Sequence, residues 1–113
     1  MKSLRNSVQL IGRLGKDPEA RTFDSGTQKV SFTLATSDSF KNQKGEKIEE
    51  TQWHNIVIWG KPAETANKYL KKGTEVVIEG RLVHRSYETS AGEKKYITEI
   101  NVNDFVLVGN KQQ

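Results

Sequence analysis

The sequence predicts an all-β domain, a small five-stranded barrel with one short helix between the third and fourth strands. Five segments are rich in β-branched and aromatic residues, and within each of them apolar residues recur at every second position. Turn signals separate these segments. Two of these segments have a glycine in their inward-facing row, which favours the sharp coiling of a closed barrel. The length of 113 residues is typical of one domain. We expect that domain over residues 1–108, followed by a short polar tail at 109–113.

The first two strands are predicted at residues 8–14 and 29–40. Each has a row of apolar side chains at every second position that we expect to face inward. These rows are Val8, Leu10 and Leu14 in the first strand and Val30, Phe32 and Leu34 in the second. Gly12 stands in the first row, where a side chain would obstruct close packing. Asp17-Pro18 and residues 24–27 mark turns between the two strands.

The third strand is predicted at residues 50–60, and a short helix follows it. Pro62 suits the first turn of a helix, because its missing N–H has no helical partner there. Apolar residues then recur at helical spacing, namely Ala63, Ala66 and Leu70. Two lysines precede Gly73, which predicts the end of the helix at that glycine.

The fourth and fifth strands are predicted at residues 74–88 and 95–109, with a hairpin turn between them. In the fourth strand Gly80 shares a row with three apolar residues expected inside, Val76, Ile78 and Leu82. In the fifth strand one face carries Tyr96, Ile100 and Val102. Five strands and one helix in this order match the OB-fold, a small Greek-key barrel.

The third strand carries large side chains on both faces, which is unusual for a strand with one side in water. Trp53 and Trp59 share one face, and Ile56 lies on the other. The two indoles therefore pack in the core, meet another subunit, or face a flat ligand such as unpaired bases. Tyr87 and Phe40 would extend this row of rings. Phe40 shares the parity of the inward-facing residues, so its exposure would require a bulge or strong twist near residue 38.

Composition narrows the function classes. The 18 basic and 14 acidic residues give a net charge of +4, a modest excess that favours a polyanionic partner but also fits an ordinary mixed surface. With no Cys and only two His, and with acids scattered through turns, no catalytic or metal-binding cluster is expected. We therefore predict no enzyme activity, no cofactor and no metal. The absence of a long apolar run or signal sequence predicts a cytoplasmic protein.

Four blocks of the sequence carry a family resemblance. They are GRLGKDPEAR (12–21), FTLATSDSF (32–40), TQWHNIVIWGKPAE (51–64) and YLKKGTEVVIEGRL (69–82). In sequence, spacing and order they resemble the bacterial single-stranded DNA-binding protein family, from about residue 4 to residue 108. The resemblance implies an OB-fold homotetramer, associated with the bacterial nucleoid. Such a protein coats single-stranded DNA without sequence choice during DNA replication, recombination and repair.

The resemblance also assigns roles to individual positions. The base-stacking aromatics of the family fall on Phe40, Trp53, Trp59 and Tyr87. The first and last of these are usually Trp in the family, whereas the third has gained a Trp here, so the stacking area per site differs. His54 corresponds to a position near the contact between subunits. It also fits a half-buried histidine that is hydrogen-bonded locally.

Flexible cations beside the rings are candidates for phosphate contacts, although a surface cation is often only solvated. Six of them lie near strand ends or loops close to the aromatic positions, namely Arg5, Arg21, Lys61, Lys72, Arg85 and Lys95. The segment 41–50 mixes lysines with glutamates and is expected to be a mobile loop in the absence of DNA.

The family normally continues past the barrel into a flexible linker with an acidic tip that recruits replication and repair enzymes. This sequence ends at Gln113 without either feature, as a shortened chain or a tail-less paralogue would. Partners that bind through the tail are therefore not expected. An alternative function is an OB-fold accessory protein, primosome-like or RNA-binding, because stacking rings do not read the 2′-hydroxyl.

Overall fold

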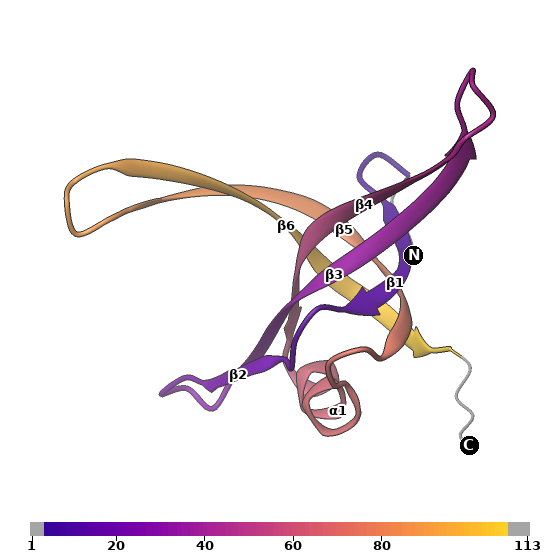
Figure 1. The fold of residues 1–113 in the computed structure, drawn as a ribbon. Helices are drawn as coiled ribbons and strands as arrows, with labels where there is room; N and C mark the ends of the chain where they lie inside the picture. The colour runs from indigo at the N-terminus through magenta and orange to yellow at the C-terminus, as the bar shows by residue number, and fades with distance from the viewer. Residues whose placement is uncertain (1–3, 109–113) are drawn as a thin grey trace.

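The computed structural model describes residues 4–108, so the predicted tail at 109–113 lies outside the described residues. Seven elements follow one another along the chain (Figure 1). They are β1 (Val8–Leu14), β2 (Glu19–Thr22), β3 (Gln28–Lys41), β4 (Lys47–Trp59), α1 (Lys61–Tyr69), β5 (Glu75–Glu88) and β6 (Lys94–Leu107).

The strands form one sheet in the order β1-β5-β6-β4-β3-β2, and an additional pairing of β1 with β3 closes five of them into a barrel. Neighbouring strands are antiparallel except β4 and β6, which run parallel. The predicted five-stranded barrel with one helix is therefore confirmed. The short strand β2 was not predicted, because its four exposed residues have no apolar alternation. It pairs with the first part of β3, outside the closed ring.

The core fills the barrel and is covered at one end by α1 (Figure 1). The strands supply most of it through Leu14, Val30, Phe32, Leu34, Ile56, Ile58, Val76, Ile78 and Ile100. The predicted face of α1 supplies Ala63, Ala66 and Leu70, and the helix packs against β3 and β4. Apolar alternation therefore placed most of the inward residues correctly, because side chains of a strand point to opposite faces in turn.

Two glycines allow backbones to approach closely, as predicted. A methyl group on Gly12 would collide with the carbonyl oxygen of Ala35, where β1 meets β3. A methyl group on Gly80 would collide with the carbonyl oxygen of Asn101, beside a register shift in the β5–β6 pairing. The prediction for Leu82, two residues further along β5, was wrong. Its side chain is 39% exposed, because β5 has passed the register shift and left the core.

Helix α1 begins as predicted but ends earlier. Pro62 lies in its first turn, and the last helical residue is Tyr69. Leu70 is already extended, with φ of −90° and ψ of 138°. Gly73, predicted to end the helix, instead lies in the turn that leads into β5, with φ of +87°. Its N–H donates to the carbonyl of Leu14 at 2.9 Å, so it ties this turn to β1.

Two long hairpins extend from the barrel in different directions (Figure 1). The β3–β4 arm ends in a turn at residues 42–46, and the β5–β6 arm ends in a turn at residues 89–93. The loop predicted at residues 41–50 is therefore a turn only at residues 42–46, and the rest of it is β-strand. Asn42 organises the first turn, because its side-chain oxygen accepts from the N–H groups of Lys44 and Glu46, each at 2.9 Å.

Candidate nucleic-acid interface

One face of the β3–β4 ribbon points away from the core and carries both tryptophans. We call it the outer face and define it by Lys29, Ser31, Thr33 and Ala35 of β3 with Trp53, Asn55, Val57 and Trp59 of β4. The Trp53 side chain is 60% exposed and that of Trp59 is 42% exposed. Of the three locations considered from the sequence, the hydrophobic core is therefore excluded for both indoles.

Trp53 lies against the backbone of the loop between β1 and β2. A methyl group placed on Gly15 in this loop would lie 2.5 Å from Cζ3 and 2.9 Å from Cη2 of the Trp53 ring. The ring therefore occupies space that only a glycine leaves open. The sequence analysis did not identify this role of Gly15, because the loop and the indole come together only when β1 pairs with β3.

Trp59 contacts a second ring and one cation, and another cation lies over that second ring. Its ring centroid lies 5.7 Å from that of Phe23, with the two planes at 83° in an edge-to-face contact. Nζ of Lys29 lies 5.3 Å from the Trp59 centroid, and Cζ of Arg21 lies 4.9 Å from the Phe23 centroid. Arg21 was predicted for this site, whereas Phe23 and Lys29 were not. We call these four residues the Trp59 cluster.

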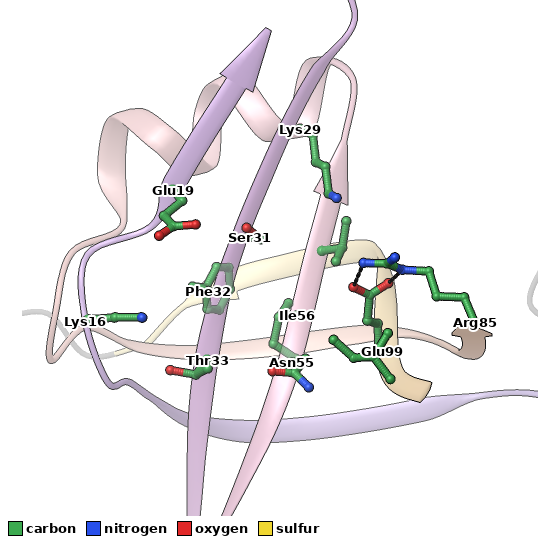
Figure 2. Close-up of a pocket in the computed structure, with 12 residues that line it drawn as sticks. Lys16, Glu19, Lys29, Ser31, Phe32, Thr33, Asn55, Ile56, Arg85 and Glu99 are labelled. Atoms are coloured by element: carbon green, nitrogen blue, oxygen red, sulfur yellow. Dashed lines mark hydrogen bonds and ion pairs between the residues drawn. The ribbon is translucent and has the colours of Figure 1, made fainter. Parts of the chain in front are cut away.

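A hollow opens in the outer face between the rows that carry the two indoles (Figure 2). Three polar side chains lie on its floor, those of Ser31, Thr33 and Asn55. Lys16 and Glu19 approach from one side, and Arg85 and Glu99 lie on the other (Figure 2). The hollow thus offers hydrogen-bonding groups and charges of both signs between two stacking surfaces.

Arg85 is fixed by a bidentate pair with Glu99. Nε of Arg85 donates to Oε1 of Glu99 at 2.9 Å, and Nη2 donates to Oε2 at 2.8 Å (Figure 2). These hydrogen bonds lower the pKa of the Glu99 carboxyl, and they raise the pKa of the Arg85 guanidinium. Glu99 is only 8% exposed, so its charge depends on this partner. Arg85 is therefore not the flexible cation assumed from the sequence, and its contact with phosphate stays a prediction.

Phe40 is exposed for a different reason from the one expected. The β3–β4 pairing runs without interruption from Lys29 opposite Trp59 to Lys41 opposite Lys47, so there is no bulge near residue 38. Phe40 keeps the parity of the inward residues but lies on the arm beyond the core, where it is 50% exposed. It consequently projects from the side of the ribbon opposite to the outer face.

The β5–β6 arm carries two exposed rings. Tyr87 is 48% exposed and lies opposite Lys95, whose Nζ is 4.0 Å from Oε1 of Glu93. Tyr96, considered from the sequence only as part of a strand face, is 76% exposed. Nζ of Lys94 lies 5.8 Å from its ring centroid. Each exposed ring of this arm therefore has a lysine as a neighbour.

The remaining predicted cations lie away from the hollow in the outer face. Arg5 precedes β1, Lys61 begins α1, and Lys72 lies in the turn after α1. The backbone N–H of Lys72 donates to a carboxylate oxygen of Asp17 at 2.8 Å, which places this turn beside the β1–β2 loop. None of the three lines the hollow between the indoles.

His54 is half-buried, and its hydrogen bond lies within the chain. Its Nε2 is 3.0 Å from Oγ1 of Thr36 on the neighbouring strand. This matches the local interpretation given from the sequence, whereas the role at a subunit contact stays a prediction. Within residues 4–108, no three acidic or histidine side chains gather closely enough to hold a metal ion. No helix in that range has the length and apolar character needed to cross a membrane.

Comparison with known proteins shows to which family the chain belongs. A sequence model described as the "Single-strand binding protein family" matches residues 5–108. The chain belongs to this family. Two relatives of this family member are both named "Single-stranded DNA-binding protein 1". The one from Chlorobaculum tepidum is 52% identical over 107 residues, which cover 94% of this chain and 66% of the relative. The one from Xylella fastidiosa is 41% identical over 108 residues, which cover 95% of this chain and 79% of the relative.

Solved structures of single-stranded DNA-binding proteins have a fold similar to that of this chain. One is described as a Plasmodium falciparum SSB complex with single-stranded DNA. It matches with a TM-score of 0.83 and 34% identity over 96% of this chain and 98% of that one. A deletion mutant of the single-stranded DNA binding protein from Thermus aquaticus matches with a TM-score of 0.81 and 30% identity. That match covers 94% of this chain and 51% of the other. The resemblance stated from the sequence is therefore confirmed.

Proposed function

We propose that this protein binds single-stranded DNA without sequence preference, with bases stacked on the outer face and its neighbouring arms. The observation that carries this proposal is the exposure of both β4 indoles, 60% for Trp53 and 42% for Trp59, beside polar side chains and cations. Base stacking on an aromatic ring contributes about 1 to 3 kcal/mol per base and tolerates any base, because every base has a π-face.

In this proposal each of the predicted aromatic and basic residues contacts a part of the single-stranded DNA. Trp53 and Trp59 take bases on the outer face, while Phe40 and Tyr87 take bases where the DNA passes onto the arms. The phosphates contact cations at the edges of this path, Arg5, Arg21, Lys61, Lys72, Arg85 and Lys95. The ion pair with Glu99 holds the Arg85 guanidinium in one orientation, which reduces the entropy lost when it meets a ligand.

The relatives support the biological setting of the proposal. They are named single-stranded DNA-binding proteins, and the Plasmodium falciparum structure is described as a complex with single-stranded DNA. By that likeness, this protein coats and protects single strands in the bacterial cytoplasm during DNA replication, recombination and repair, and it catalyses no reaction. No specific observation favours the primosome-like or RNA-binding alternative.

We also propose that the protein assembles as a homotetramer. A hydrophobic content of 34% makes the core of one chain small. Several large apolar side chains away from the outer face remain exposed, among them Ile11 at 56% and Val106 at 58%. Burial of such residues between subunits would add apolar area that the single chain lacks.

Fluorescence titration tests the binding proposal. Addition of oligo(dT) should quench tryptophan emission, whereas duplex DNA of the same length should have little effect. Trp53→Ala and Trp59→Ala should each weaken oligo(dT) binding by about 1 to 3 kcal/mol. Because both rings are largely exposed, neither variant should lose its β-sheet circular dichroism spectrum.

Tyr69→Ala is the matched control for these variants. Tyr69 is an aromatic residue with 53% exposure, but it lies on α1 and not on the outer face or on either arm. Its removal should leave oligo(dT) affinity unchanged. Equal affinity for duplex and single strand, or equal losses for the α1 and β4 variants, would contradict the proposal. A parallel titration with oligo(U) separates DNA binding from the RNA-binding alternative.

A further inference from the structure

Two cations stand directly opposite each other next to Trp59. Arg21 of β2 is the cross-strand partner of Lys29 of β3, and Lys29 is in turn the cross-strand partner of Trp59 of β4. The three side chains therefore form one row across three strands. Like charges in directly opposite positions repel each other, so this arrangement is unfavourable unless an anion joins them.

Neither cation forms an ion pair with any acidic side chain in the part of the chain that the structure describes. Within residues 4–108, Arg21 and Lys29 form no ion pair within 4.0 Å and no side-chain hydrogen bond. Glu99 is close enough for Lys29 to help lower its pKa, but its two oxygens are already bonded to Arg85. Each cation rests on a ring instead, Arg21 on Phe23 and Lys29 on Trp59.

A hollow lies beside the two cations. It is lined by Glu19, Ala20, Arg21, Lys29 and Ser31. The Ser31 hydroxyl can donate a hydrogen bond to an anion held there. Glu19 adds a negative charge, but the two cations outnumber it. The hollow is therefore suited to a single small anion such as one phosphate group of a nucleic acid.

We propose that Arg21 and Lys29 together bind one phosphate of the nucleotide whose base stacks on Trp59. Lys29 leaves the face of the indole as the base arrives. The proposal rests on the proposed function and deepens it. The interaction of a cation with an exposed ring contributes less free energy than the stacking of a base does, so the base displaces the ammonium group from the ring. The displaced ammonium then forms a charge-assisted hydrogen bond to the phosphate.

Phe23 completes this arrangement as a positioning residue. Its edge-to-face contact with Trp59 holds the indole plane in place during the exchange. Arg21 lies on Phe23, so the guanidinium is kept beside the hollow before DNA arrives. The Trp59 cluster therefore prepares one stacking surface and one phosphate site together.

Salt dependence of oligo(dT) binding tests the proposal. For single strands, each phosphate contact contributes about 0.7 to the slope of log K against log salt. The double variant Arg21→Gln/Lys29→Gln should therefore bind with a slope that is shallower by about 0.7, because both cations contact the same phosphate. Lys29→Gln and Arg21→Gln alone should each make the slope shallower by part of that amount, and the affinity of each should approach that of the wild type as salt is raised. Lys29→Arg keeps the charge and should keep the wild-type slope.

Lys68→Gln is the matched control, because Nζ of Lys68 also lies over a ring, 5.9 Å from the centroid of Tyr69 on α1. Its slope should equal that of the wild type. A wild-type slope for Lys29→Gln, or tighter binding by Lys29→Gln at every salt concentration, would show that Lys29 binds no phosphate and overturn this inference alone. Failure of the wild-type protein to bind oligo(dT) would overturn the proposed function as well.

Discussion

Trp53 and Trp59 have the same chemistry and lie on the same strand, but different neighbours hold them. Trp53 rests on the backbone at Gly15, whereas Trp59 is held by an edge-to-face contact with Phe23 and covered by Lys29. In both cases the indole orientation is set before a ligand arrives. A ring that is already ordered loses less conformational entropy on binding, so more of the stacking free energy appears as affinity.

Gly15→Ala should disturb one stacking surface without disturbing the core. The added methyl group would lie 2.5 Å from Cζ3 of Trp53, so the indole must move. We expect Gly15→Ala to weaken oligo(dT) binding by about 1 kcal/mol. Trp53→Ala should weaken it more. Tryptophan emission in a Trp59→Phe background, where Trp53 is the only indole, would report the displacement.

A double-mutant cycle supplies the control for Gly15→Ala. In the Trp53→Ala background the methyl group has no ring to displace, so it should cause almost no further loss of affinity. Equal losses in the two backgrounds would mean that Gly15 acts on binding by some route other than Trp53.

At the scale of elements, the Arg85–Glu99 pair joins β5 and β6 where their arm leaves the barrel. Glu99 lies opposite Val83 and Arg85 lies opposite Ile97, so the pair bridges diagonally across two strands. Glu99 also lies opposite Asn55 of β4 in the parallel pairing. A carboxylate at this junction of three strands is buried, and it depends on its one strong partner.

The stability contributed by this pair should depend on pH. The pKa of Glu99 is lowered in the folded protein, so its contribution is fully present above the unfolded value of about 4.3. This contribution to stability is lost as the pH falls through the lower pKa that Glu99 has in the folded protein. Glu99→Gln should destabilise the protein by about 1 kcal/mol at pH 7, a low figure because Arg85 is half exposed. Urea unfolding of both proteins from pH 7 to pH 3 should show the difference shrinking on acidification.

Glu93→Gln provides the comparison for this experiment. Glu93 lies in the turn of the same arm, 4.0 Å from Lys95, and both side chains are largely exposed. Its removal should change stability little at any pH. A stability difference between the wild type and Glu99→Gln that stays constant down to pH 3 would argue against the role assigned to the ion pair.

For the whole molecule, the hydrophobic core and the aromatic rings proposed to bind DNA lie in separate places. The core is one cluster inside the barrel, covered by α1 (Figure 1). The rings proposed to stack on bases lie on the outer face and on two arms that extend beyond the core. Substitution of these rings should therefore change binding far more than stability.

Assembly of the whole molecule is tested at His54. We expect light scattering to give four times the mass of one chain at micromolar concentration. His54→Ala should dissociate at higher protein concentrations than the wild type if this half-buried histidine supports the subunit contact. His84→Ala is the control, because His84 also bonds a threonine, with Nδ1 2.9 Å from Oγ1 of Thr98, but on the exposed β5–β6 arm. Identical behaviour of the two variants would remove His54 from the proposed contact.

Much of the fold followed from the sequence because strand periodicity is a local property. Alternation alone placed Val30, Phe32 and Leu34 inside, and it placed both tryptophans on one face. Glycines in the inward rows indicated where backbones approach closely, because only a missing side chain allows that approach. The family resemblance rested on four separate blocks of sequence, and the match over residues 5–108 confirmed it.

Tertiary structure decided what depends on strand register and on where the core ends. Parity was correct for Phe40 and Leu82, yet both are exposed, because their strands continue past the barrel. The contacts of Trp59 with Lys29 and Phe23, and of Arg85 with Glu99, join different strands. Alternation assigns each side chain to a face, but only the pairing of strands distant in sequence determines its neighbours on that face.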